Sequence, residues 1–135
     1  MTESLWPKTV LVVDDEPSIR RLVQLTLESD GWDVHTAEST ADAIEVLRAM
    51  DGPPTAAVLD IMMPGADGVA LGGIIGEVLH PPPVILYLTA KTDEATLQRA
   101  VILGGASDYL TKPFDPVTLT DRLESFCAEA GRPIA

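Results

Sequence analysis

Cysteine is almost absent from this chain, since Cys127 is the single one among 135 residues. An internal disulfide is therefore excluded. Hydrophobic residues make up 46% of the chain, which is enough to build a buried core. We expect Cys127 to be a small, half-buried side chain on the last helix rather than a reactive thiol. This cysteine usage fits a reducing compartment, so we expect a cytoplasmic protein.

Long apolar runs are absent as well. No segment approaches the roughly 18 consecutive apolar residues that a membrane span needs. Residues 1–8 lack the basic and apolar pattern of a signal peptide. We therefore expect no association with a membrane.

Basic residues are scarce relative to acidic ones. The chain has 9 lysines and arginines and 21 aspartates and glutamates, which gives a formal net charge of -12. Because such a chain repels a phosphate backbone, we expect no direct nucleic-acid binding by this segment. The acidic surplus indicates either a solvated surface or a group of carboxylates around a cation, and the positions of these residues must decide.

The pattern along the chain predicts one α/β domain. Its 135 residues fit a single domain. Short β-branched runs alternate with longer stretches of helical spacing, which is typical of a parallel sheet with crossover helices. The predicted strands are residues 9–13, 32–36, 55–59, 84–89 and 108–111. The predicted helices begin near residues 17, 39, 67, 93 and 115 and end near residues 30, 51, 79, 103 and 126.

The third of these helices is rich in glycine. It contains Gly72, Gly73 and Gly76, and each glycine costs roughly 0.8 to 1 kcal/mol relative to alanine in a helix interior. Its sequence is also nearly free of charged residues. We expect this helix either to be distorted or to pack against a partner.

Polar side chains occur where four of the predicted strands end. Asp14 and Asp15 follow the first strand, Asp60 follows the third, Thr89 ends the fourth and Lys112 follows the fifth. Because the carboxyl ends of parallel strands face one crevice, we expect these side chains to meet there. Three carboxylates without a cation would repel one another, so the arrangement implies a positive partner.

A divalent metal ion is the simplest positive partner. Ligands that are all oxygen favour Mg²⁺, with Mn²⁺ as the alternative, over zinc. A main-chain carbonyl near Met62 would supply a further oxygen. With its charge screened, an oxygen of Asp60 can attack phosphorus in line, while Lys112 and the Thr89 hydroxyl bind the equatorial oxygens. The product would be an acyl phosphate.

Four motifs occur in this order: VVDDE at residues 12–16, LDIMMP at residues 59–64, LTA at residues 88–90 and DYLTKPF at residues 108–114. Together they resemble the response-regulator receiver domains of two-component signal transduction. The resemblance spans residues 8–128 and leaves residues 1–7 and 129–135 as flanking tails. It implies a flavodoxin-like, doubly wound, three-layer fold with five parallel strands in the order 2-1-3-4-5.

Carried over by position, the resemblance implies a role for each residue of the crevice. Asp60 is the phosphoacceptor, Asp15 and Asp60 bind the metal ion directly with the Met62 carbonyl, and Asp14 holds a metal-bound water. The implied donor is a phosphohistidine on a sensor histidine kinase or a histidine phosphotransfer protein. The chain would also catalyse its own phosphorylation by small phosphodonors and its own slow dephosphorylation.

The resemblance also implies a switch. The phosphoryl group would draw the Thr89 hydroxyl inward and free space for the Tyr109 ring. The face made by the fourth helix, fifth strand and fifth helix would then control an output domain or a downstream protein, and a phosphorylation-dependent homodimer is a further implied partner. Met62 and Lys91 occupy the two positions that tune the phosphoryl lifetime in this family, and we expect both to impede attacking water.

Two other functions deserve comparison. An interaction module with this fold that never accepts phosphate would lack some of the acidic residues, and none is missing here. A phosphoaspartate phosphatase also has an aspartate after a strand, but it typically needs an Asp-x-Asp pair. Met62 stands where the second carboxylate would be.

Overall fold

Strands and helices alternate along the whole chain in the computed structural model, which describes residues 5–63, 67–90, 94–103, 105 and 108–134. The strands are β1 (Thr9–Val13), β2 (Asp33–Ala37), β3 (Ala56–Asp60), β4 (Val84–Thr89) and β5 (Asp108–Thr111). The helices are α1 (Pro17–Ser29), α2 (Thr40–Ala49), α3 (Gly68–Val78), α4 (Glu94–Ile102) and α5 (Pro116–Glu129).

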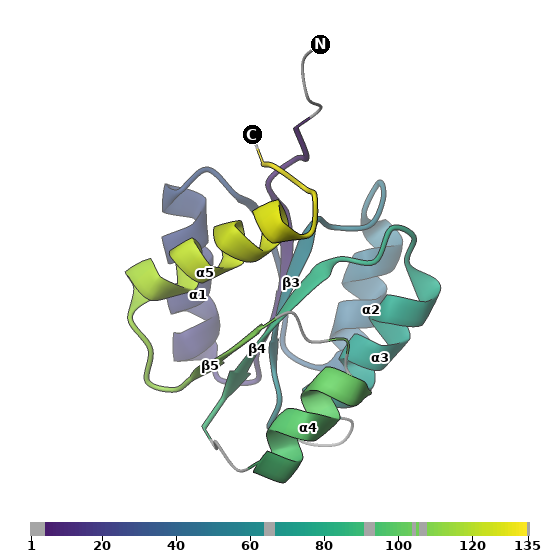
Figure 1. Ribbon diagram of the computed structural model, residues 1–135, viewed down its shortest axis with the longest axis vertical. Helices are drawn as coiled ribbons and strands as arrows, with labels where there is room; N and C mark the ends of the chain where they lie inside the picture. Colours follow the sequence, from purple (N-terminus) through teal and green to yellow (C-terminus); the bar gives the residue numbers. More distant parts are fainter. Residues whose placement is uncertain (1–4, 64–66, 91–93, 104, 106–107, 135) are drawn as a thin grey trace.

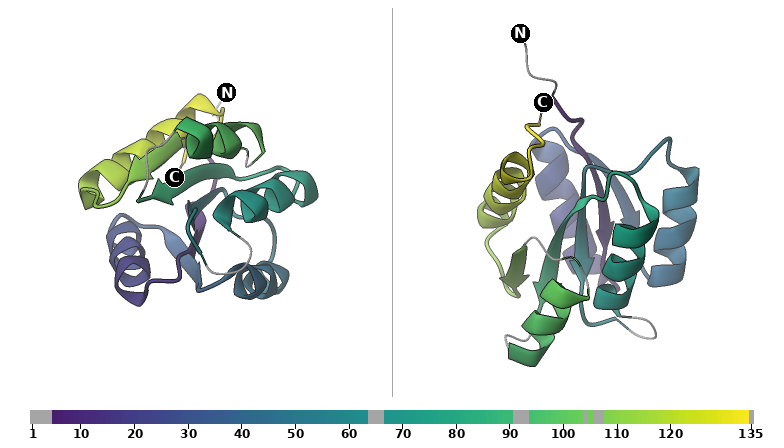
Figure 2. Two further views of the ribbon diagram at one scale, coloured as in Figure 1. Left: turned by 90° about the horizontal axis from the view of Figure 1, so that it is seen from below. Right: turned by 45° about the vertical axis from the view of Figure 1, so that its right-hand side comes forward.

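The five strands form one sheet in the order β2-β1-β3-β4-β5, and every pairing is parallel. The sheet lies between two layers of helices (Figures 1 and 2), with α1 and α5 on one face and α2, α3 and α4 on the other. This three-layer arrangement confirms the predicted fold class and strand order.

The central strands are buried on both faces because helices cover both sides of the sheet. In β1, Val10 and Val12 pack in the cluster that contains the α1 and α5 side chains. Leu11 and Val13 pack in the cluster on the α2 and α3 side. The alternation follows from the two-residue period of a strand, and it accounts for a run that is apolar at every position.

The predicted element bounds need small corrections. β2 and β3 each lie one residue later than predicted, so that Trp32 precedes β2 and Asp60 is the last residue of β3. The predicted start of the fourth helix at Asp93 lies outside the described residues. Cys127 is fully buried rather than half-buried, and burial raises the pKa of its thiol to about 11.

The glycine-rich α3 is a continuous helix over its eleven residues. The Asp67 side chain caps it by accepting a hydrogen bond from the Ala70 N–H at 3.0 Å. Leu71 and Ile75 are buried against the sheet. Capping and burial therefore offset the low helix propensity of the glycines.

The two flanking segments contact each other at the end of the sheet where the strands begin (Figure 1). The Trp6 N–H donates to the Pro133 carbonyl at 2.7 Å, and the Arg132 guanidinium lies 4.8 Å from the Trp6 ring centre. Ile134 packs against the core on the α1 and α5 side. Among the described residues, no helix combines the length and the apolar character that crossing a bilayer requires.

Candidate functional site

Three aspartates come together at the carboxyl ends of β1 and β3. Asp14 follows β1, and Asp60 ends the neighbouring β3, because Val13 pairs with Leu59. One carboxylate oxygen from each of Asp14, Asp15 and Asp60 lies within 4.8 Å of the others. Asp14 and Asp60 are buried, and Asp15 is half-buried.

Hydrogen bonds hold the loop that carries Asp14 and Asp15. The Glu16 N–H donates to Asp14 Oδ1 at 2.9 Å, and the Arg20 guanidinium on α1 donates to the Asp14 carbonyl at 2.8 Å. The Asp14 N–H donates to the Ala37 carbonyl at 3.2 Å. Arg20 was not predicted from the sequence, because an arginine on an amphipathic helix is ordinarily a solvated side chain.

The turn after Asp60 is tightly packed. The Met62 N–H donates to Asp60 Oδ1 at 3.2 Å, and the Gly68 N–H donates to the Ile61 carbonyl at 3.1 Å. A β-carbon at Gly68 would collide with the main-chain oxygen of Asp60, so only glycine fits there. The sequence signal for this close approach was limited to a glycine directly after the capping Asp67.

Lys112 lies among the carboxylates. Its Nζ is 3.0 Å from Asp14 Oδ2, 3.4 Å from Asp60 Oδ2 and 3.6 Å from Glu16 Oε1. Burial acts against the charge of Lys112, but its contact with Asp14 and the nearby charges of Asp60 and Glu16 prevail, and the pKa of Lys112 lies above its ordinary value. The ammonium group is therefore charged at neutral pH.

Asp60 is strongly perturbed. Burial and the negative charge of Asp14 raise the pKa of Asp60 to about 7, against the opposing effect of Lys112. One ammonium group does not balance three carboxylates, so the site attracts a further cation.

The donor set fits a hard divalent cation such as Mg²⁺. Asp14 Oδ2 is buried, and the Lys112 ammonium lies 3.0 Å from it. Asp14, Asp15 and Asp60 are the one group of three potential metal-binding side chains within the described part of the chain. All three offer carboxylate oxygens, and no histidine or cysteine belongs to the group.

Thr89 and Tyr109 lie on the neighbouring strands. Thr89 ends β4, is fully buried, and pairs with Thr111 of β5. Its carbonyl accepts a hydrogen bond from the Lys112 N–H at 2.7 Å, so the backbone links these two residues. The Tyr109 side chain is 39% exposed on β5. Tyr109 therefore does not belong to the buried site in this structure, and Lys91 lies outside the described residues.

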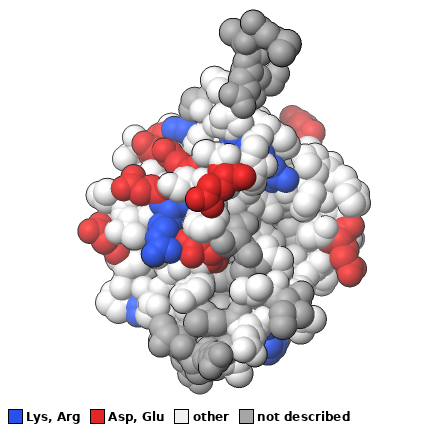
Figure 3. All heavy atoms as spheres, in the orientation of Figure 1, with Lys and Arg blue, Asp and Glu red and all other residues white. Residues whose placement is uncertain are grey.

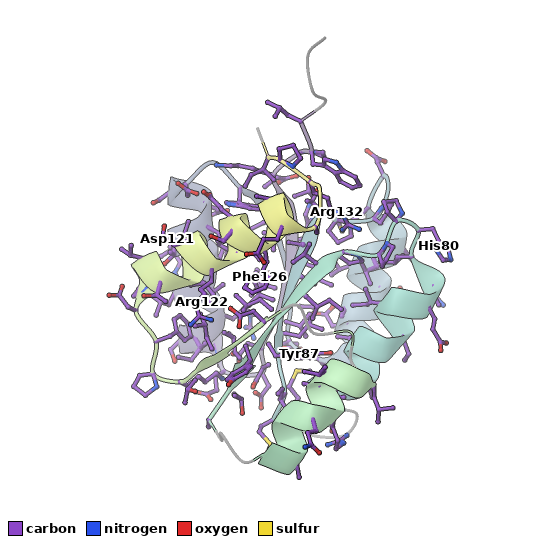
Figure 4. All side chains as sticks on the ribbon, viewed as in Figure 1. His80, Tyr87, Asp121, Arg122, Phe126 and Arg132 are labelled. Atoms are coloured by element: carbon purple, nitrogen blue, oxygen red, sulfur yellow. The ribbon has the colours of Figure 1, made fainter. Side chains whose placement is uncertain are left out.

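Another tyrosine, Tyr87, is buried on the opposite side of the sheet from α5. Its ring projects from β4 into the layer of α3 and α4 (Figure 4) and belongs to the core cluster there. His80 precedes β4 and lies at the other end of the sheet from the aspartates (Figure 4). Neither residue contributes to the site.

Comparisons with known proteins agree with this geometry. A family profile described as "Response regulator receiver domain" matches residues 10–124. The phosphate regulon transcriptional regulatory protein PhoB of Pseudomonas aeruginosa is 37% identical over 126 residues, which cover 92% of this chain and 53% of that protein. The alkaline phosphatase synthesis transcriptional regulatory protein PhoP of Bacillus subtilis is 40% identical over 118 residues, which cover 87% of this chain and 48% of that protein.

Solved structures show the same fold. The chemotaxis response regulator CheY4 of Vibrio cholerae superposes with a TM-score of 0.79 at 30% identity, over 90% of this chain and 99% of that chain. By contrast, this chain spans about half the length of the curated relatives it matches.

Proposed function

Since the chain belongs to the response regulator receiver domain family, we propose that it is a phosphorylation-dependent switch of a two-component system whose phosphoacceptor is Asp60. The observation that carries the proposal is the position of Asp60, with Lys112 Nζ 3.4 Å from its Oδ2 and with Asp14 and Asp15 in the same cluster. We propose residues 8–128 as the receiver domain and residues 1–7 and 129–135 as its flanking tails.

The proposed cofactor is Mg²⁺, with Mn²⁺ as the alternative. Asp15, Asp60 and the Met62 carbonyl would hold it directly, and Asp14 would contact it indirectly. When bound, the ion supplies positive charge that neutralises the acceptor carboxylate and the incoming phosphoryl oxygens. The three carboxylate oxygens that lie within 4.8 Å of one another support this assignment.

Asp60 acts as the nucleophile in the proposed reaction. One of its carboxylate oxygens forms a bond to phosphorus, and the phosphorus–nitrogen bond of the donor phosphohistidine breaks, with the electron pair leaving on the imidazole nitrogen. Asp60 must be ionised to react, and the positive charge of Lys112 favours that form. Lys112 then contacts a phosphoryl oxygen, because catalysis of phosphoryl transfer depends mainly on alignment and charge neutralisation.

The proposed readout passes through Thr89 and Tyr109 to the face made by α4, β5 and α5. A separate contact joins the start of α3 to α4, because the Arg99 guanidinium on α4 donates to Asp67 Oδ2 at 3.1 Å. Asp67 caps α3 directly after the acceptor turn. A change at the acceptor can therefore reach α4 through a charged contact as well as through Thr89.

The proposed phosphodonor is a sensor histidine kinase or a histidine phosphotransfer protein in the cytoplasm. Because similar proteins are named transcriptional regulatory proteins, the output is proposed to be a further domain or a downstream protein that binds DNA. The charge of -12 on this chain argues against direct DNA binding by the receiver itself.

The proposal is tested by incubating the purified chain with acetyl phosphate and Mg²⁺ and measuring its intact mass. We expect one added phosphoryl group, lost in Asp60→Ala and retained in Asp51→Ala, whose side chain is exposed and lies beyond α2. An unmodified wild-type chain would favour the rival function, an interaction module that accepts no phosphate. An adduct that persists in Asp60→Ala would show that the acceptor is another residue.

A further inference from the structure

Arg20 of α1 contacts the loop of the aspartates on both sides of Asp15. Its guanidinium donates to the Asp14 carbonyl at 2.8 Å, and its N–H donates to the Glu16 carbonyl at 3.0 Å. Asp15 stands between these two acceptors in the sequence, and its side chain is half-buried, whereas those of Asp14 and Asp60 are buried. One residue therefore restrains the backbone on either side of the most accessible carboxylate of the cluster.

The start of α1 has no side-chain cap. The helix follows Glu16, whose side chain makes no capping hydrogen bond. By contrast, α2, α3 and α5 follow side chains that accept a hydrogen bond from the first turn, namely Ser39, Asp67 and Asp115. A capping side chain satisfies N–H groups at the start of a helix and ties the preceding residue to the first turn. At α1 the Arg20 guanidinium holds the entering loop instead.

The charge of Arg20 is not used in an ion pair. Arg48, Arg99 and Arg122 each pair with a carboxylate, and over α5 basic and acidic side chains lie against one another (Figure 3). Arg20 forms no such pair with any residue that the structure describes, and its guanidinium donates to the neutral Asp14 carbonyl. A charged donor makes a stronger hydrogen bond than a neutral one. The contact therefore acts on the position of the loop rather than by pairing with the acidic charges.

From this geometry we propose that Arg20 is a positioning residue for metal binding. It holds the peptide group that joins Asp14 to Asp15, and so keeps the Asp15 carboxylate within 4.8 Å of the other two before an ion binds. Removal of a group that orients metal ligands without touching the ion typically lowers metal affinity by about 10- to 100-fold. The inference rests on the proposed function, because it concerns the proposed Mg²⁺ site.

The first test is the binding of Mn²⁺, measured by the loss of the free-ion signal in electron paramagnetic resonance. Arg20→Met keeps much of the apolar part of the side chain but removes the donor, and we expect it to raise the dissociation constant by about tenfold. Arg20→Lys should recover part of the affinity, because its ammonium group can donate to the same carbonyl. Arg21→Met is the matched control, since Arg21 is exposed on the same helix, and it should bind as tightly as wild type.

The second test separates metal affinity from the rate of the reaction. The Mg²⁺ concentration that half-saturates phosphorylation by acetyl phosphate should rise by about tenfold in Arg20→Met, while the rate at saturating Mg²⁺ changes much less. The reason is that Arg20 contacts the backbone of the loop and no carboxylate of the cluster. A purely structural role would instead lower the free energy of unfolding in EDTA and leave the metal affinity of the folded chain unchanged.

Three outcomes would overturn the inference and leave the proposed function intact. They are an Arg20→Met chain that binds Mn²⁺ as tightly as Arg21→Met does, an Arg21→Met chain that loses as much affinity as Arg20→Met, and an Arg20→Lys chain that binds no better than Arg20→Met. A wild-type chain that binds no Mn²⁺ would overturn the inference together with the proposed cofactor.

Discussion

Asp60 and Asp14 are both buried, and Lys112 is the cation that contacts each of them. Such a cluster is unfavourable for the folded chain, because burial and mutual repulsion disfavour the ionised carboxylates. The same repulsion favours the binding of a cation, which would neutralise the carboxylates. We infer that stability and reactivity oppose each other at Asp60.

Stability without metal should therefore depend on pH through Asp60. The folded pKa is about 7 and the ordinary value is 3.8, so the folded chain binds more protons than the unfolded chain between these pH values. It follows that the free energy of unfolding falls as pH rises from about 4 to about 7. Asp60→Asn removes this effect, and urea titrations in EDTA should find it more stable than wild type by on the order of 1 to 3 kcal/mol near neutral pH. Near pH 4 the two proteins should be similar, and a difference that does not vary with pH would contradict this assignment.

Lys112 is expected to matter more for reaction rate than any other cation of the chain. Lys112→Ala removes the charge beside Asp60 and should slow phosphorylation by acetyl phosphate by about a hundredfold, as loss of a donor to a developing negative charge does in other enzymes. Lys8→Ala is the control, because Lys8 pairs with Asp30 and Glu124 away from the site. Equal rates in the two variants would remove Lys112 from the mechanism.

Met62 is expected to lengthen the life of the acyl phosphate. Its side chain is 51% exposed and lies two residues after Asp60, where a bulky apolar group hinders an approaching water molecule. Met62→Asn replaces it with a polar side chain, and decay of the phosphorylated chain should become several-fold faster in a time course of intact mass. An unchanged decay rate would show that Met62 has no such role.

At the scale of elements, the apolar runs were sufficient to predict every strand and the layers that cover them. The strand ends were less certain, because a strand buried on both faces has no polar alternation to fix its register. β3 illustrates this, since it extends to Asp60, a residue that its polarity had placed outside the strand. For α3, helix propensity alone underestimated the stability of the helix, because Asp67 caps it and the buried Leu71 and Ile75 hold it against the sheet.

Alanine substitutions at two glycines near opposite ends of α3 should change the free energy of unfolding in opposite directions. Gly68→Ala forces a β-carbon against the Asp60 carbonyl and should lower the free energy of unfolding by about 1 to 3 kcal/mol. Gly76→Ala has open space and should raise it by about 0.8 to 1 kcal/mol in dilute solution. Denaturant titrations of both variants measure this, and a stable Gly68→Ala protein would show that the acceptor turn is not closely packed.

At the scale of the whole molecule, the contact between the flanking segments closes the fold at the end opposite to the aspartates. The Arg132 guanidinium covers the Trp6 ring, and its Nη1 lies 3.5 Å from the Thr55 carbonyl oxygen. Arg132→Ala should lower the free energy of unfolding by about 1 kcal/mol, while Arg21→Ala, an exposed position on α1, should change little. Thermal melts that do not distinguish the two variants would show that this contact contributes nothing.

The convergence of Asp14, Asp15, Asp60 and Lys112 could be predicted because each lies at the carboxyl end of a strand, and parallel strands end at one edge of the sheet. The contacts that hold these residues in place could not be predicted from the sequence. Glu16 and Arg20 lie at the start of α1, and only the three-dimensional path of the loop brings them to Lys112 and to the Asp14 carbonyl. The roles of all these residues in phosphoryl transfer stay predictions.

A crystal structure of the chain with Mg²⁺ and beryllofluoride, a phosphoryl mimic, is the most direct test of the proposed function. We expect the beryllofluoride on a carboxylate oxygen of Asp60, with the ion bound by Asp15 and Asp60 and with Lys112 in contact with the mimic. Beryllofluoride bound elsewhere, or a chain that binds neither group under these conditions, would contradict the assignment of Asp60 as the phosphoacceptor.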